Sequence, residues 1–289
     1  MKNPFRRHKH CAPAGTDQIA RFLHDIKSAA PQSYDRLTSD AWAAAHDDQC
    51  AQIQTQIRSD AFLNEWTAEM ERLTAPGETV LEIGCALGAT SLYLARRGRH
   101  VTGLDYAQRM CDTFVANAAA LGLNVSSICA DITRPLPITD NTFDVVWHAG
   151  VIEHFSPAES QFIIRENARV ARRCVISMAP NAASIAYRIG KEYAERTGAW
   201  RAGTEYPKYT QQDLFINAGL GDIREYSIDM DFALAFLPPG QLRDTLATIY
   251  HNLPTDDDIH QGYLLVTIGY KNKTGHRPVF YFNSSASVA

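Results

Sequence analysis

The chain has 289 residues, of which 45% are hydrophobic, 21% are charged and 10% are aromatic. This composition is typical of a globular protein and excludes a largely disordered chain. The 28 Lys and Arg residues against 32 Asp and Glu residues give a formal net charge of −4. That charge does not favour nucleic acid or an anionic membrane surface as a partner. The length predicts one large domain or a domain with an appendage.

The first residues, MKNPFRRHKHC, are basic and are not followed by an apolar segment, so we predict no secretory signal. The longest apolar run near the C-terminus, residues 232–237, is too short to span a membrane. The six cysteines form no CxxC pair and have no regular spacing, which favours reduced thiols. We therefore expect a soluble, cytoplasmic protein with no membrane partner.

The N-terminal quarter of the chain has a helical pattern. Apolar residues recur at helical spacing between Thr16 and Leu73, and Ala75-Pro76-Gly77 ends this region. We expect a basic, flexible tail over residues 1–15 and a helical extension, acting as a lid, over residues 16–77.

From residue 79, short β-branched runs alternate with helical stretches. The predicted strands are 79–83, 100–104, 125–129, 143–147 and 173–178. The predicted helices between them are 86–97, 107–121 and 157–170, the last capped by Ser156. Such alternation implies right-handed βαβ crossovers and a parallel sheet covered on both faces. The sequence therefore predicts an α/β fold with a doubly wound sheet.

The elements are spaced more widely after Pro180. We predict helices at 182–196 and 211–218 and strands at 223–228 and 263–270. Two intervening segments, near 181–210 and 231–258, are longer than connections require. We expect them to form a substrate cap within a domain that spans residues 78–272, followed by a C-terminal tail over 273–289.

A glycine-rich turn follows the strand that ends at Ile83. Gly84 allows a sharp turn, and Gly88 allows a ligand or a strand to approach the backbone closely. Asp105 follows 21 positions after Gly84 at the end of the next strand, where a carboxylate can accept hydrogen bonds from both hydroxyls of a ribose. The dinucleotide fingerprint needs a second glycine where Ala86 stands, which disfavours a nicotinamide dehydrogenase. A different nucleoside cofactor is therefore expected.

Four ordered motifs identify the family that this chain resembles. They are EIGCALG at 82–88, GLDYAQRM at 103–110, CADI at 129–132, and NTFDVVW at 141–147 followed by VIEH at 151–154. Over residues 78–180 the chain resembles the class I S-adenosylmethionine-dependent methyltransferases of the small-molecule type, with a type 11/25-like domain. Ala86 is the one departure from the first motif. The resemblance implies a Rossmann-like, seven-stranded, mostly parallel sheet with a helical N-terminal extension and C-terminal cap insertions.

The same resemblance implies S-adenosylmethionine as cofactor and S-adenosylhomocysteine as product. Glu82 would face the cofactor ammonium group, Asp105 the ribose and Asp131 the adenine amino group. The predicted cofactor-binding residues are Glu82, Gly84, Cys85, Ala86, Gly88, Asp105, Tyr106, Met110, Asp131, Ile132, His148 and Ala149.

Methyl transfer requires an aligned acceptor and the exclusion of water, and a hydroxyl acceptor also needs a base. His148 leaves the fourth strand beside the expected methyl position, and an imidazole titrates near neutral pH. We predict it to be the catalytic residue, either as general base or by positioning the acceptor. The predicted acceptor-binding residues are Tyr34, Trp42, His154, Asn181, Tyr206 and Tyr209.

Two groups of residues resemble metal ligands. His148, Glu153 and His154 lie close together in sequence without a fourth ligand, which disfavours a metal site. The segment His8-Lys9-His10-Cys11 could also bind a metal, but a basic tail is the simpler interpretation. No metal is predicted.

The sequence therefore predicts methyl transfer to an O, N or S atom of a small-molecule acceptor. The alternatives are a methyltransferase of a macromolecule, RNA or protein, and a non-catalytic S-adenosylmethionine-binding protein of the same fold. No Asn/Asp-Pro-Pro-Tyr/Phe motif follows the fourth strand and no basic stripe lies beyond the N-terminal tail, which disfavours a nucleic-acid substrate. A monomer and a homodimer are both compatible with the sequence.

Overall fold

The computed structural model describes residues 38, 50–59, 64–200, 202–252 and 261–271. All of them belong to one compact unit, Asp35–Ala289. The strands are β1 Thr79–Ile83, β2 His100–Asp105, β3 Ser126–Cys129, β4 Phe143–Ala149, β5 Ala171–Pro180, β6 Leu220–Ile228 and β7 Leu264–Lys271. The helices of the first half are α3 Cys50–Arg58, α4 Glu65–Leu73, α5 Ala89–Arg96 and α6 Gln108–Ala120. Those of the second half are the short 3₁₀ helix η2 Ile152–His154, α7 Pro157–Val170, α8 Ile185–Arg196, α9 Gln212–Asn217, α10 Met230–Ala235 and α11 Gln241–His251.

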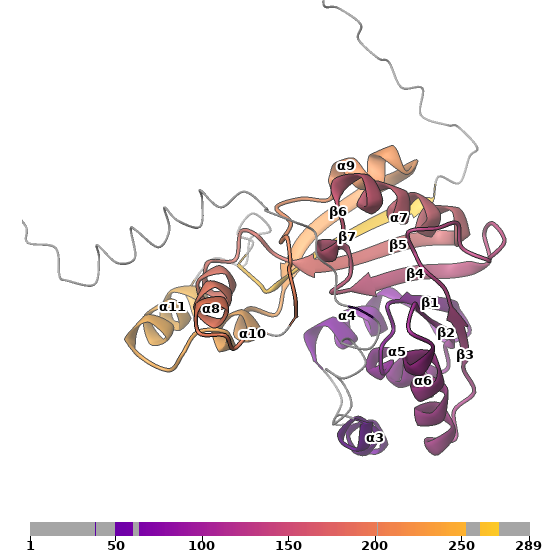
Figure 1. The fold of residues 1–289 in the computed structure, drawn as a ribbon, viewed down its shortest axis with the longest axis horizontal. Helices are drawn as coiled ribbons and strands as arrows, with labels where there is room; N and C mark the ends of the chain where they lie inside the picture. The colour runs from indigo at the N-terminus through magenta and orange to yellow at the C-terminus, as the bar shows by residue number, and fades with distance from the viewer. Residues whose placement is uncertain (1–37, 39–49, 60–63, 201, 253–260, 272–289) are drawn as a thin grey trace, which may run out of the picture. The chain divides into compact units, whose positions relative to one another are not determined.

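The seven strands form one sheet in the order β3-β2-β1-β4-β5-β7-β6 (Figure 1). Strands β1 to β5 pair in parallel, and β7 pairs antiparallel with both β5 and β6. This confirms the predicted α/β class and the mostly parallel, seven-stranded, Rossmann-like sheet. The strand order reverses between β1 and β4, so a crevice is expected outside their carboxyl ends.

Helices cover both faces of the sheet (Figure 1). One hydrophobic core joins α3 to α6 with the side of the sheet that carries Val80, Val145 and Trp147. A second core joins α7 and α9 with the opposite side, which carries Leu81 and Val146. Side chains alternate between the two faces along each strand, so adjacent residues of β1 and β4 belong to different cores. This alternation decides which strand residues reach the functional site.

The first helix of the sheet begins three residues later than predicted, at Ala89 rather than at residue 86. Gly84, Ala86 and Gly88 have φ angles of +68°, +45° and +68°. These left-handed conformations are incompatible with a right-handed helix. Helix α5 therefore begins directly after Gly88.

Both long C-terminal segments contain helices, of which the sequence predicted only the one in the first segment. Helix α8 lies in the first, and α10 and α11 lie in the second. They share a small apolar core that includes Tyr187, Leu234 and Tyr250. None of the helices within the described ranges is long and apolar enough to cross a membrane.

Candidate functional site

Two cavities lie at the carboxyl ends of the central strands. The first has a volume of about 420 Å³ and is lined by Gly84, Ala86, Leu104, Asp105, Tyr106, Met110, Asp131, Ile132, Ala149, Gly150, Val151, His154 and Phe155. The second, of about 540 Å³, is lined by Gln52, Ile53, Gln56, Asn64, Trp66, Glu82, Gly84, Cys85, Ala86, Leu87, Gly88, Ala89, Thr90, Trp147, Ala149, Gly150, Tyr263 and Leu264. Four residues line both cavities: Gly84, Ala86, Ala149 and Gly150. The cavities therefore adjoin where β1 and β4 end, at the reversal of strand order.

The glycine loop forms the wall shared by the two cavities. The backbone N–H groups of Gly84 and Cys85 donate to the Leu104 carbonyl at 2.7 and 3.0 Å. A Cβ atom at Gly84 would lie 2.7 Å from Val151 Cγ2, and one at Gly88 would lie 2.1 Å from the Phe114 ring. Both glycines are therefore required by close packing as well as by their positive φ angles.

Asp105 joins the loop to the end of β2. Its Oδ2 accepts a hydrogen bond from the Ala86 N–H at 3.0 Å, and its Oδ1 accepts one from the Ala107 N–H at 2.9 Å. The side chain is buried but lines the first cavity. These two bonds hold the carboxylate at the cavity wall, where the sequence predicts contact with ribose hydroxyls.

The far end of the first cavity holds four further predicted cofactor residues: Tyr106, Met110, Asp131 and Ile132. The Asp131 Oδ1 accepts hydrogen bonds from the N–H and the hydroxyl of Thr133 at 2.9 and 2.7 Å. This fixes the orientation of an exposed carboxylate beside the cavity. The wall thus combines an aromatic ring, apolar side chains and an oriented acid, which suits a nucleoside base.

Glu82 lines the second cavity on the other side of the loop. It is 8% exposed, and its Oε2 has no hydrogen-bond partner among the residues described. Burial raises the pKa of this carboxyl group to about 8. Ser91 acts against this rise in pKa. A buried, incompletely paired carboxyl group on a residue of the cavity wall suits a ligand that carries a donor or a positive charge.

The structure places His148 in the interior rather than on a cavity wall. Its side chain is fully buried and lines neither cavity, whereas its neighbours Trp147 and Ala149 line the second. Burial lowers the pKa of His148 to about 3, so the ring is neutral at working pH. Because side chains alternate along β4, the ring points to the opposite face of the sheet. Neither ring nitrogen has a hydrogen-bond partner among the described residues, and the catalytic and cofactor roles of His148 stay a prediction.

The predicted acceptor residues do not all come together. His154 lines the first cavity, and its Nδ1 lies 2.9 Å from the Thr204 carbonyl. Asn181 is buried, donates to the Gly262 carbonyl at 3.0 Å and lines neither cavity. Tyr206 and Tyr209 also lie outside both cavity walls, Tyr209 with 71% exposure. Tyr34 and Trp42 lie outside the described residues.

Sequence reasoning missed much of the second cavity. Its outer wall comes from α3, from Trp66 on α4 and from Tyr263 just before β7. The rings of Trp66 and Tyr263 each contact Phe232, with centroids 5.9 and 5.1 Å apart. The sequence showed only that Trp66 lies in a helical pattern. No local pattern relates it to Phe232 and Tyr263, which lie more than 160 positions away.

Comparisons with known proteins agree with this geometry. A family model described as a methyltransferase domain matches residues 80–173. The chain is 40% identical over 81 residues to (S)-tetrahydroprotoberberine N-methyltransferase of Eschscholzia californica, which covers 27% of this chain and 23% of that protein. It is 32% identical over 102 residues to ubiquinone biosynthesis O-methyltransferase of Hahella chejuensis. That alignment covers 35% of this chain and 42% of the relative. The matches thus span less than half the length of these relatives.

The fold has known counterparts as well. A crystal structure of an S-adenosylmethionine-dependent methyltransferase, a possible histamine N-methyltransferase from Thermotoga maritima, aligns with a TM-score of 0.53 and 14% identity. The alignment covers 78% of this chain and 98% of that protein, and it shows a shared fold.

Fold and site together define a Rossmann-like domain that binds a nucleoside cofactor at the switch point of its sheet. The family match makes this class specific. Residues 80–173, about a third of the chain, match a methyltransferase domain, and this match supports a class I S-adenosylmethionine-dependent methyltransferase domain with S-adenosylmethionine as its cofactor.

Proposed function

We propose that this protein transfers a methyl group from S-adenosylmethionine to an O, N or S atom of a small-molecule acceptor. The observation that carries the proposal is the pair of adjoining cavities, with Asp105 and Asp131 on one wall and the unpaired Glu82 carboxyl oxygen on the other. The nucleoside part of the cofactor needs acceptors such as Asp105 and Asp131, and its amino-acid tail needs a carboxylate such as Glu82. The small-molecule substrates named for the relatives support the choice of acceptor class.

The residues present fit the cofactor in two places, and two glycines hold the loop between them. Glu82 offers a carboxylate to an ammonium group, and Asp105 offers its carboxylate to ribose hydroxyls. Gly84 and Gly88 keep the loop free of Cβ atoms that would clash with Val151 and Phe114. When bound, the cofactor would supply a methyl group on a positively charged sulfur. The acceptor atom would attack the methyl carbon in line with the carbon–sulfur bond, and S-adenosylhomocysteine would leave.

The described residues of the cavity walls bind and orient the acceptor, and they exclude water. With His148 in the core, an acceptor that is already nucleophilic, such as a neutral amine or a thiolate, needs no further base. Trp66 and Tyr263 supply apolar surface on the second cavity, which favours dehydration of a bound acceptor. We infer a cytoplasmic location as well. The free thiols of Cys85, Cys111, Cys129 and Cys174 support it.

Calorimetry with S-adenosylmethionine, S-adenosylhomocysteine and NAD tests the cofactor, and methyl release into a panel of amines, thiols and phenols tests the activity. We expect both S-adenosyl compounds to bind and NAD not to bind. Glu82→Gln should weaken binding of both, whereas Glu192→Gln, a matched change on the surface of α8, should not. Binding without turnover on any acceptor would favour the non-catalytic alternative, and turnover only on RNA or protein would favour the macromolecular one.

A further inference from the structure

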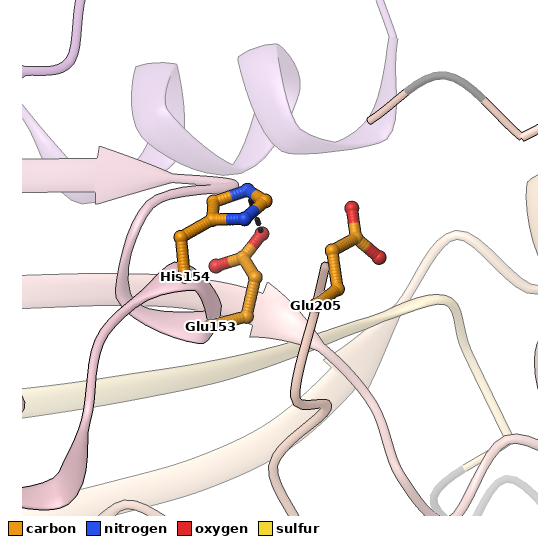
Figure 2. A group of neighbouring side chains, drawn as sticks. All are labelled: Glu153, His154 and Glu205. Carbon is orange, nitrogen blue, oxygen red and sulfur yellow. Dashed lines mark ion pairs between the residues drawn. The ribbon is translucent and has the colours of Figure 1, made fainter. Parts of the chain in front are cut away.

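Three potential metal ligands meet beside the first cavity. Glu153 and His154 belong to η2, and Glu205 belongs to the segment between α8 and α9 (Figure 2). The N–H of Tyr206 donates to the Glu153 carbonyl at 2.9 Å and so holds the two segments together. One carboxylate or imidazole atom from each of the three side chains lies within 4.8 Å of the other two.

The tautomer of His154 presents a lone pair to this cluster. Its Nδ1 lies 2.9 Å from the Thr204 carbonyl, which can only accept, so Nδ1 carries the proton. In the neutral ring Nε2 is then an acceptor, and it lies 3.9 Å from Glu153 Oε1. A cation between two acceptor atoms that face each other in a buried place would be favourable to both. A histidine whose second nitrogen is fixed by a carbonyl is the usual arrangement of a metal ligand.

The two carboxyl groups of the cluster are buried, and that of Glu153 is incompletely hydrogen-bonded. Glu153 is 1% exposed, and its Oε2 has no hydrogen-bond partner within the described part of the chain. Glu205 is also buried and accepts a hydrogen bond from the Tyr187 hydroxyl at 2.9 Å. Lys208 acts electrostatically on Glu153, and Lys191, which also pairs with Glu195, acts on Glu205.

We propose that Glu153, His154 and Glu205 bind one divalent ion of a first-row transition metal. A donor set of one imidazole nitrogen and carboxylate oxygens suits ions such as Zn²⁺ and Mn²⁺ better than Mg²⁺ or Ca²⁺. Ligand atoms around such an ion lie roughly 3 to 4 Å apart, so the cluster has to contract only slightly. Because His154 also lines the first cavity, an open coordination position would face that cavity. This inference does not rest on the proposed methyltransferase activity.

Metal binding to the full chain, stripped with a chelator and dialysed, tests the proposal. We expect one equivalent of Zn²⁺ or Mn²⁺ to bind and to raise the melting temperature, with Mg²⁺ binding at least tenfold more weakly. Glu205→Gln and Glu153→Gln should each weaken binding at least tenfold. In Glu205→Gln the new amide oxygen can still accept from Tyr187, and the loss of a buried carboxylate should leave the metal-free melting temperature unchanged or higher.

Two controls separate this cluster from other ligands. Glu192→Gln removes a carboxylate from the surface of α8, and a combined His8→Ala, His10→Ala and Cys11→Ser variant removes the N-terminal candidate ligands. Both variants should bind the ion as the unaltered protein does. The proposal is overturned if the unaltered protein binds no stoichiometric ion, if both cluster variants bind it undiminished, or if the N-terminal variant loses it. Absence of binding would mean that a proton balances the cluster instead.

Discussion

At residue 86 the sequence shows a departure from the family motif, but only the structure shows the backbone conformation that the alanine adopts. Alanine stands where the family motif has glycine, and the structure gives it a φ of +45°. The left-handed region costs an L-residue roughly 1–2 kcal/mol relative to glycine. The N–H of Ala86 nevertheless bonds Asp105 at 3.0 Å, so the loop keeps its shape. The departure from the motif is therefore a strain on the loop rather than a change of its path.

Ala86→Gly should stabilise the protein by roughly 0.5–1 kcal/mol, because relief of the left-handed strain exceeds the entropy that glycine adds to the unfolded chain. Urea unfolding measures the change. Ala95→Gly, in α5, is the matched control and should destabilise by about 1 kcal/mol. Equal destabilisation by the two substitutions would contradict the strain at residue 86.

His148 should make stability dependent on pH. Its pKa of about 3 in the folded state lies below the ordinary value of 6.5, so the stability that it contributes is present above pH 6.5 and is lost as pH falls toward 3. Glu82 and Glu205 have raised pKa values, of about 8 and about 7, and act in the opposite direction.

The difference between the protein and a His148→Leu variant isolates the histidine. Between pH 7 and pH 5 this difference should move by about 2 kcal/mol in favour of the variant. Denaturant unfolding at the two pH values measures it. A difference that does not change with pH would show that the ring is accessible or charged.

At the scale of elements, local signals placed helices and strands, and contacts set their ends. Helix α7 spans residues 157–170 as predicted, because Ser156 and Glu159 form a capping box that is visible in the sequence. Strand β5 runs from Ala171 to Pro180, longer than the predicted 173–178, because β4 and β7 pair with it on both sides. The start of α5 was predicted wrongly because the loop needs three left-handed residues, of which only two are glycines.

Gly88→Ala tests the packing of this loop against α6. The added Cβ would lie 2.1 Å from the Phe114 ring at a φ of +68°, so we expect a loss of more than about 2 kcal/mol. Gly122→Ala is the matched control, since Gly122 has a φ of +70° and no atom within 4 Å of the added Cβ. The control should lose only about 1 kcal/mol. Similar losses for both would mean that Phe114 moves aside freely.

At the scale of the whole molecule, the site is assembled from segments far apart in sequence. The second cavity brings Gln52 and Trp66 of the N-terminal helices together with Glu82 and with Tyr263. The cluster of Glu153 and Glu205 likewise depends on a segment that returns after α8. Cofactor binding should therefore affect groups on several elements. Ionisation of the Glu82 carboxyl group is one effect that can be measured directly.

S-adenosylmethionine should release about one proton when it binds at pH 7. The Glu82 carboxyl, with a pKa of about 8, is mostly protonated in the empty cavity and should ionise beside the cofactor ammonium group. Calorimetry in buffers of different ionisation enthalpy measures the proton. In Glu82→Gln the release should disappear and affinity should fall roughly 10- to 100-fold. Full proton release by that variant would place the titrating group elsewhere.

The sequence by itself determined the alternation of strands and helices along residues 79–180 and the family, and it predicts the residues around the adenosine portion of the cofactor. These depend on local periodicity and on motifs such as EIGCALG, which carry their information within a few positions. The tertiary structure alone decided that His148 belongs to the core, because the pairing of β4 sets the face to which each residue points. It also decided that Glu205 joins Glu153 and His154, because long connections bring side chains together without leaving a pattern in the sequence.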